Sequence, residues 1–212
     1  MVIREWLKRC PLIAILRGIE THEVDAQFSA LFTAGIVIAE IPLNSPEPFK
    51  SIRHAADRFG DRMLVGAGTV IAASQVAAAE AAGVRLIVSP NADAAVVREA
   101  KRLGLIAIPG CGTATEAFAM VHAGADALKL FPADVMGPRM LTGLRAVLPQ
   151  GTAFIPVGGV DANTISVWRE AGADGYGIGS ALYKSGGSAQ ETSANAKRLL
   201  ESLHQAHPQA RA

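Results

Sequence analysis

Short runs of Val, Ile, Leu and Ala alternate along the chain with longer amphipathic stretches, and a glycine stands at most of the junctions. Before Gly35, for example, Val24, Phe28 and Leu31 recur at helical spacing, and the glycine fits the left-handed position that ends a helix. The junction glycines are Gly35, Gly60, Gly83, Gly104, Gly124, Gly151 and Gly172. Strand-like residues follow each of them. The regular spacing leaves room for one strand, one helix and two short loops, so the pattern predicts a repeated βα unit.

Each predicted strand is almost continuously apolar, which is typical of parallel strands covered on both faces. The strands are predicted at residues 12–16, 36–41, 63–66, 85–88, 105–108, 126–130, 154–157 and 175–178. Helix-start signals lie between them, such as Thr113 with Glu116 three residues later. The other starts are predicted at Thr21 with Glu23 nearby, at Pro138 in a first turn, and at Asp161. An additional helix is expected at 3–9 and the last helix at 188–206.

Eight βα units in 212 residues favour a small closed (β/α)8 TIM barrel over an open doubly wound sheet. A dinucleotide-binding sheet would need Gly-x-Gly-x-x-Gly after its first strand, where this chain has only Arg17-Gly18-Ile19. We therefore expect one domain over residues 1–212, with the barrel proper at about 11–206 and an extra N-terminal helix. No nucleotide cofactor is expected, and the tail at 208–212 should fray.

Composition excludes several classes of function. The chain is 50% hydrophobic with a mean hydropathy of +0.27, yet every apolar stretch is interrupted before the roughly 20 residues that span a bilayer. Lys and Arg number 20 and Asp and Glu 19, a net charge of +1 without a basic run. Neither nucleic acid nor a membrane is therefore an expected partner. Charged residues interrupt the apolar residues that follow Met1, whereas a secretory signal has an uninterrupted apolar core. The protein is therefore expected to be cytoplasmic.

Cysteine and histidine positions favour neither a disulfide framework nor a metal site. Cys10 and Cys111 are too few for a framework and lack zinc spacing, so reduced thiols are expected. Cys111 stands in a strand-end loop and is a candidate nucleophile, but no residue supplies it with a base, and packing is the preferred interpretation. Because the histidines and clustered carboxylates are absent from the predicted strand ends, no metal is expected.

Three predicted strand ends carry a lone charge, at the end of the barrel where function is built. Lys129 lies in an apolar strand, where burial lowers the pKa of an amine and leaves a nucleophile toward ketones. Glu40 ends the second strand on the same face and is placed to shuttle protons. Arg17 offers a planar fork suited to a carboxylate. The structural alternatives are a rim lysine that reaches water or pairs with a carboxylate, a buried ion pair of Glu40 with Lys129 or Arg17, and a solvent-facing arginine.

The last two strand-end loops present backbone amides where barrels commonly hold phosphate. Gly158 and Gly159 follow the seventh strand, and Gly179 and Ser180 follow the eighth. A tight turn explains any single glycine, but the two loops together favour a phosphate site. Thr69 offers a further hydroxyl donor, with a helix cap as an equally simple explanation. Together these side chains predict an aldolase that forms a Schiff base with a phosphorylated keto acid.

Seven segments also lie in register with one family, from about residue 11 to residue 184. They are 12–18 (LIAILRG), 39–46 (AEIPLNSP), 66–70 (GAGTV), 89–91 (SPN), 109–116 (PGCGTATE), 128–133 (LKLFPA) and 157–160 (VGGV). As a set they resemble the 2-keto-3-deoxy-6-phosphogluconate and phosphogalactonate aldolase family. The resemblance implies a class I, metal-free reaction without a cofactor, pyruvate and a phosphorylated keto acid as ligands, and a homotrimer of barrels.

By the same resemblance, Lys129 is the Schiff-base lysine, Glu40 is the general acid and base, and Arg17 and Thr69 hold the pyruvate portion. The glycines and serine of the last two loops match the phosphate end. Gluconate enzymes typically carry Thr-Leu-Arg-Thr after the glutamate and Pro-Thr-Gly-Gly after the seventh strand. This chain has residues 41–45 (IPLNS) and 156–159 (PVGG) instead, which resemble the phosphogalactonate branch, although Pro156 follows the gluconate pattern.

Three rival functions stay open at this point. A gluconate-specific aldolase would use identical chemistry on the C4 epimer of the substrate. A phosphosugar isomerase or epimerase would use Glu40 as a base without any imine. A phosphate-binding module, in which Lys129 and Glu40 merely pair, would bind ligand without turning it over.

Overall fold

The strands of the computed structural model, which describes residues 2–205, run parallel in two curled sheets. The larger sheet contains, in spatial order, β5 (Ile106–Ile108), β4 (Leu86–Val88), β3 (Leu64–Gly68), β2 (Ile38–Pro42), β1 (Leu12–Ile15) and β9 (Tyr176–Ile178). The smaller sheet contains β6 (Gly110–Cys111), β7 (Leu128–Leu130) and β8 (Phe154–Pro156). Each predicted strand range overlaps an observed strand, so the prediction of a parallel α/β fold is confirmed.

Pro109 separates β5, which lies within the fifth predicted strand range, from β6, a short strand that the sequence pattern did not predict. Because proline has no backbone N–H, it interrupts the hydrogen-bond ladder. The segment before it, β5, pairs with β4, and the segment after it, β6, pairs with β7. The two sheets still meet at both margins: the N–H of Asp126, just before β7, donates to the Ala107 carbonyl of β5 at 3.0 Å, and Val157 forms an isolated parallel bridge with Gly177.

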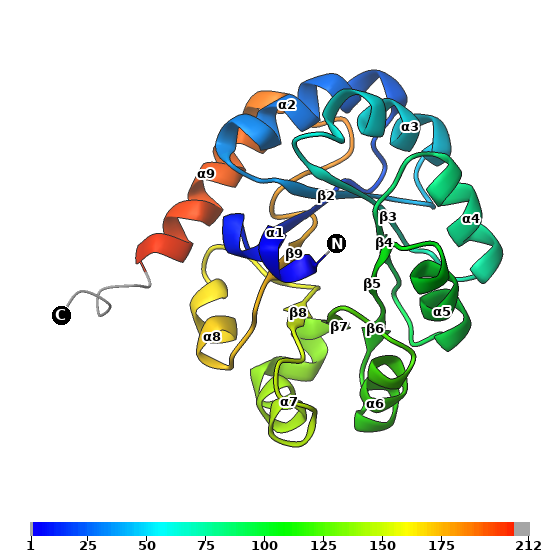
Figure 1. The fold of residues 1–212 in the computed structure, drawn as a ribbon. Helices are drawn as coiled ribbons and strands as arrows, with labels where there is room; N and C mark the ends of the chain where they lie inside the picture. The colour runs from blue at the N-terminus through cyan, green and yellow to red at the C-terminus, as the bar shows by residue number, and fades with distance from the viewer. Residues whose placement is uncertain (1, 206–212) are drawn as a thin grey trace.

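Helices follow the strands and lie around the outside of the sheets (Figure 1). They are α2 (Val24–Ala34), α3 (Pro48–Phe59), α4 (Ala73–Ala81), α5 (Ala94–Arg102), α6 (Ala114–His122), α7 (Ala133–Val147), α8 (Ile165–Glu170) and α9 (Ala189–Gln205). The predicted additional helix is α1 (Ile3–Arg9), which lies across the front of the ring in Figure 1. The predicted last helix corresponds to α9. Residue 206 of that range and the tail at 208–212 lie outside the described residues.

Most junction glycines act as predicted, but one does not. Gly35 ends α2 with a φ of 101°, the left-handed conformation that glycine adopts most readily. Gly60, by contrast, follows α3 with a φ of −56°. Glycine is required there for space, because a methyl group would collide with the carbonyl oxygen of Ala56.

Three of the predicted helix starts need correction, namely Thr21, Pro138 and Asp161. Thr21 opens a short 3-10 helix (Thr21–Glu23) that Glu20 and Glu23 cap, and the Thr21 hydroxyl instead lies 2.9 Å from that of Ser51. Pro138 lies inside α7, where Gly137 (φ 72°, ψ 164°) breaks the helix, so the proline begins its second segment. The predicted cap at Thr113 is confirmed, since its hydroxyl accepts the Glu116 N–H at 3.2 Å.

Asp161 caps a turn rather than the first residues of α8. Its Oδ1 atom accepts the backbone N–H groups of Asn163 and Thr164 at 2.9 and 3.0 Å, and α8 begins one residue later. None of the helices within residues 2–205 combines the length and apolarity needed to cross a membrane.

Candidate active site

Glu40 lies in the middle of β2 and is almost completely buried, with 1% of its surface exposed. Its Oε2 atom has no hydrogen-bond partner. Burial raises the pKa of this carboxyl to about 7, because a carboxylate loses hydration there, while the charges of Lys129 and Arg17 lower it in part. A carboxyl group that titrates near neutral pH is suited to both accepting and donating a proton.

Lys129 is the central residue of β7 and is 5% exposed. Burial lowers the pKa of its ammonium, the charge of Glu40 raises it in part, and Arg17 lowers it further. Its Nζ atom lies 4.7 Å from the centre of the Phe131 ring. Among the described residues Lys129 forms no ion pair within 4.0 Å, so the alternative of a close Glu40–Lys129 ion pair is wrong. The amine is therefore buried and is not held in a close ion pair.

Arg17 follows β1 and is exposed, but its side chain is held in place. Nη1 donates to Oδ1 of Asn44 at 2.6 Å, and Nη2 donates to Oγ1 of Thr69 at 3.5 Å. The loops after β1, β2 and β3 thus meet at the guanidinium. Arg17 is thus exposed to solvent, as the structural alternative expected, and is also held by two hydrogen bonds. Its charge lowers the pKa of both Glu40 and Lys129.

Thr69 follows β3 with a φ of 55°, a left-handed backbone that a β-branched residue rarely adopts. Its hydroxyl contacts Arg17, whereas the start of α4 is served by Gln75, whose Oε1 accepts the N–H groups of Ile71 and Ala72. The alternative of a helix cap for Thr69 is therefore wrong. Strain of this kind is tolerated most often at functional sites.

A cavity of about 440 Å³ opens beside these residues. Five of the predicted site residues line it: Arg17, Gly158, Gly159, Gly179 and Ser180. Its other lining residues are Ile15, Phe131, Val157, Val160, Asp161, Gly177, Ala181 and Lys184. Gly158 and Gly159 both have positive φ, of 109° and 66°, which keeps the loop after β8 close to the cavity.

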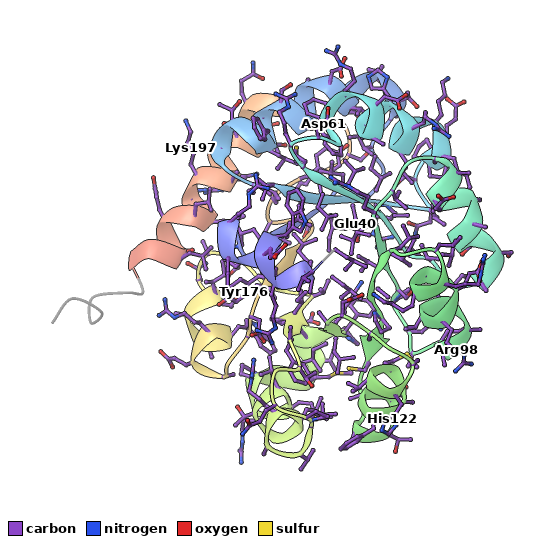
Figure 2. All side chains as sticks on the ribbon, viewed as in Figure 1. Glu40, Asp61, Arg98, His122, Tyr176 and Lys197 are labelled. Atoms are coloured by element: carbon purple, nitrogen blue, oxygen red, sulfur yellow. The ribbon has the colours of Figure 1, made fainter. Side chains whose placement is uncertain are left out.

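The remaining predicted residues, Glu40, Lys129 and Thr69, do not line this cavity, but contacts connect them to it. Phe131 lines the cavity and lies over the Lys129 amine, and Arg17 lines the cavity and bonds Thr69. In Figure 2, Glu40 lies inside the ring of helices, whereas Arg98, His122 and Lys197 lie at its periphery. The structure thus places Glu40 and Lys129 in the middle of their strands rather than at the predicted strand ends, and the other predicted residues in the loops that follow the strands.

Sequence reasoning missed three residues of this site. Asn44 orients Arg17, Asp161 and Lys184 line the cavity, and none of them was proposed as a site residue. Asn44 and Asp161 each follow a predicted strand, so their position at a strand end was the available signal. Lys184 lies four residues beyond Ser180, and no local pattern marked it.

Cys111 does not have the environment of a nucleophile. Burial, together with the charge of Glu116, raises the pKa of its thiol to about 12, so the thiolate is scarce at neutral pH. Cys10 is also buried, and both thiols are free. The packing interpretation of Cys111 is therefore supported. Within the described residues, no three His, Cys, Asp or Glu side chains gather where they would hold a metal ion.

Comparison with known proteins gives a consistent result. A family model described as aldolase, KDPG and KHG aldolase, matches residues 3–198. The 2-dehydro-3-deoxy-6-phosphogalactonate aldolase of Escherichia coli (strain K12) is 44% identical over 202 residues, which cover 95% of this chain and 98% of that protein. A probable enzyme of the same name from Rhizobium meliloti (strain 1021) is 46% identical over 84% of each chain.

A solved structure described as native KDPGal superposes on this fold with a TM-score of 0.92. It is 44% identical in sequence and covers 93% of this chain and 96% of its own. The family model and both relatives agree with the resemblance drawn from the seven sequence segments. The chain belongs to the KDPG and KHG aldolase family.

Proposed function

We propose that this protein is a 2-dehydro-3-deoxy-6-phosphogalactonate aldolase, which cleaves its substrate reversibly to pyruvate and D-glyceraldehyde 3-phosphate. The observation that carries the proposal is the pair of buried, oppositely charged side chains Lys129 and Glu40. Each changes the pKa of the other, yet no close ion pair joins them. Burying two charged groups costs stability, and a reaction that needs a free amine beside a carboxyl group accounts for that cost.

The reaction begins when the neutral amine of Lys129 attacks the C2 ketone of the substrate. The adduct is a carbinolamine, which loses water to form an iminium ion. The positive nitrogen then accepts the electron pair that is released when the C3–C4 bond breaks. Burial supports the first step, because it lowers the pKa of Lys129 and so raises the fraction of free amine.

Glu40 supplies the proton transfers. As a carboxylate it takes the proton of the C4 hydroxyl while the C3–C4 bond breaks, which releases the aldehyde and leaves an enamine on Lys129. Return of a proton to C3 and hydrolysis of the imine then release pyruvate and the free amine. A pKa of about 7 suits a group that both takes and gives a proton at neutral pH.

The two ends of the substrate have separate supports. The Arg17 guanidinium and the Thr69 hydroxyl, which contact each other, are placed to hold the carboxylate of the pyruvate portion. At the other end, the backbone of Gly158, Gly159 and Gly179 and the hydroxyl of Ser180 line the cavity that would take the phosphate.

The choice of C4 epimer is supported by residues 41–45 and 156–159, which resemble the phosphogalactonate branch, and by the names of the relatives at 44% and 46% identity. Pro156 favours the gluconate epimer as the second candidate. Parallel assays on the two phosphorylated epimers measure the preference directly. A higher kcat/KM on the gluconate epimer would reverse the choice and leave the mechanism unchanged.

Trapping with borohydride tests the mechanism. After incubation with pyruvate and borohydride, mass spectrometry with peptide mapping should find one pyruvyl adduct on Lys129. Lys129→Met should remove both the adduct and turnover, whereas Lys197→Met, a change at an exposed lysine of α9, should keep both. Folded wild-type protein without an adduct would favour an isomerase that uses Glu40 alone, or a binding module if no substrate is turned over.

The architecture proposed with this function is a closed (β/α)8 barrel within a single domain over residues 1–212. The Asp126–Ala107 hydrogen bond and the Val157–Gly177 bridge support closure, because they join the two sheets at both margins. We further propose a homotrimer, as the family resemblance implies, and a cytoplasmic location, which suits the free thiols of Cys10 and Cys111. Sedimentation equilibrium would measure the subunit number.

A further inference from the structure

The cavity beside the active site has three charged lining residues, namely Arg17, Asp161 and Lys184. A phosphate ester carries close to two negative charges at neutral pH. Backbone amides and a serine hydroxyl orient such a group but carry no net positive charge. A positive charge opposite the phosphate must therefore come from one of these three side chains.

Two of the three charges are already engaged by the protein. Arg17 donates to Asn44 and Thr69, at the end of the site assigned to the carboxylate. Asp161 directs Oδ1 toward the N–H groups of Asn163 and Thr164, which satisfies its negative charge within its own loop. Asp161 is an anion, and Arg17 is assigned to the substrate carboxylate, so neither is the cation that the phosphate needs.

Lys184 is the third charged residue of the cavity lining, and its charge is not used by another part of the described chain. Its side chain is exposed, and within the described part of the chain it makes no side-chain hydrogen bond or ion pair. Glu191 is an acidic residue whose pKa the charge of Lys184 lowers, and its carboxylate accepts the N–H and hydroxyl of Ser188 at 2.8 and 3.0 Å. The pKa of Glu191 is lowered mainly by those Ser188 bonds and least by Lys184.

The backbone that carries Lys184 is fixed at both sides. The preceding residue, Tyr183, donates its hydroxyl to Glu23 at 3.3 Å, and the following residue, Ser185, donates its hydroxyl to the carbonyl of Gly18 at 2.9 Å. The second bond ties this loop to the residue next to Arg17. Lys184 also lines a neighbouring cavity of about 380 Å³ that shares Arg17 and Ser180 with the first. The backbone of Lys184 is thus held in place at the edge of the cavity, and its side chain is flexible.

We propose that Lys184 is the side-chain cation that recognises the substrate phosphate and makes the enzyme select phosphorylated over unphosphorylated substrates. This inference rests on the proposed aldolase function. Lysine binds phosphate as a point charge, so it adds attraction to the dianion without fixing its orientation. The glycine loops and Ser180 then set the orientation.

The test compares cleavage of the phosphorylated substrate with cleavage of its unphosphorylated analogue, 2-dehydro-3-deoxygalactonate. Lys184→Met keeps the length of the side chain and removes the charge. We expect it to raise KM for the phosphorylated substrate by about ten- to a hundredfold, the range for loss of one charged hydrogen bond. The kcat/KM for the unphosphorylated analogue and formation of the pyruvate adduct should stay unchanged.

Two further variants separate charge from structure. Lys184→Arg should restore most of the selectivity because it restores the charge, and Lys197→Met should match the wild type. Equal losses on both substrates, or unchanged selectivity in Lys184→Met, would overturn the assignment of Lys184 while the wild-type adduct and turnover keep the aldolase function. A wild-type protein that forms no adduct and cleaves neither substrate would overturn both.

Discussion

A methyl group on Gly68 would collide with the Oε2 atom of Glu40. Gly68 is the last residue of β3 and pairs with Pro42, two residues beyond Glu40 on β2. The bare backbone of β3 therefore forms a wall of the space that holds the carboxyl group. The position of the proposed acid and base depends on the absence of a side chain on the neighbouring strand.

Gly68→Ala should consequently disable the reaction by displacing Glu40. We expect kcat to fall by about 10²- to 10⁴-fold, the usual contribution of a positioned general acid or base. The measurement is steady-state cleavage, with circular dichroism to establish that the variant is folded. Wild-type kcat in a folded Gly68→Ala protein would show that the carboxyl group does not need its observed position.

Gly143→Ala is the matched control for that substitution. Gly143 lies in α7, its φ is not positive, and an added methyl group would meet no atom within 4 Å. Alanine costs less backbone entropy than glycine in a helix, so this variant should be more stable by about 0.5–1 kcal/mol. Its kcat should equal that of the wild type.

The raised pKa of Glu40 predicts the pH dependence of cleavage. Because bond breaking needs the carboxylate, kcat/KM should rise with pH, with an inflection near the Glu40 pKa of about 7, and level off above it. The lowered pKa of Lys129 acts in the same direction, since the free amine is also the deprotonated form. The two groups are coupled, so the inflection belongs to the pair.

Glu40→Gln separates the two contributions to that profile. The amide cannot titrate, so the residual activity should be low and should lose the inflection near pH 7. The measurement is kcat/KM for both proteins between pH 5 and pH 9, in roughly half-unit steps. An unchanged inflection in the variant would assign it to Lys129 rather than to Glu40.

The sequence predicted the fold and the principal charged residues because both depend on local pattern. A lysine or glutamate within a run of apolar residues has to be buried when the run is a covered strand, and Lys129 and Glu40 follow that rule. Their positions along the strands were not predicted, because both lie in the middle of a strand rather than at its end. The strand β6 after Pro109 was not predicted, because its two residues are recognisable as a strand only from their pairing with β7.

The partners of the site residues were not predictable in this way. Arg17 meets Asn44 and Thr69 through loops from three strands, and their meeting depends on the register between strands rather than on any one segment. The close approach of Gly68 to Glu40 likewise depends on the register between β2 and β3. Lys184 was not predictable as a site residue because a lone lysine in a loop is ordinarily solvated. Its place in the lining of the cavity is known only from the structure.

Asn44 should act as a positioning residue for the substrate carboxylate. Asn44→Ala removes the 2.6 Å hydrogen bond to Arg17 and should raise KM severalfold, with a smaller effect on kcat. Asn44→Asp keeps an acceptor but adds a negative charge that pairs with Arg17 and repels a carboxylate, so its KM should rise further. Steady-state kinetics of both variants test the order. A lower KM in Asn44→Asp than in Asn44→Ala would contradict it.

Asp174 should stabilise the fold without contributing to catalysis. It lies before β9, where its Oδ2 atom accepts the Phe154 N–H at 2.9 Å and also pairs with Arg145. Asp126 plays the same part before β7, accepting the Ala107 N–H at 2.8 Å and the Lys101 ammonium at 2.6 Å. Each carboxylate thus ties the start of its strand to the preceding strand and to the helix that comes before that preceding strand, α7 for Asp174 and α5 for Asp126.

Asp174→Ala should lower the free energy of unfolding by about 2 kcal/mol, because it leaves a strand N–H and a guanidinium without their acceptor. Urea unfolding measures this change, and kcat should stay at the wild-type value, since Asp174 lies at the opposite end of β9 from Gly179 and Ser180. Asp61→Ala is the control, because Asp61 is exposed and lies at the periphery in Figure 2. Equal effects of the two substitutions on stability would mean that the Asp174 carboxylate adds nothing to the junction between β8 and β9.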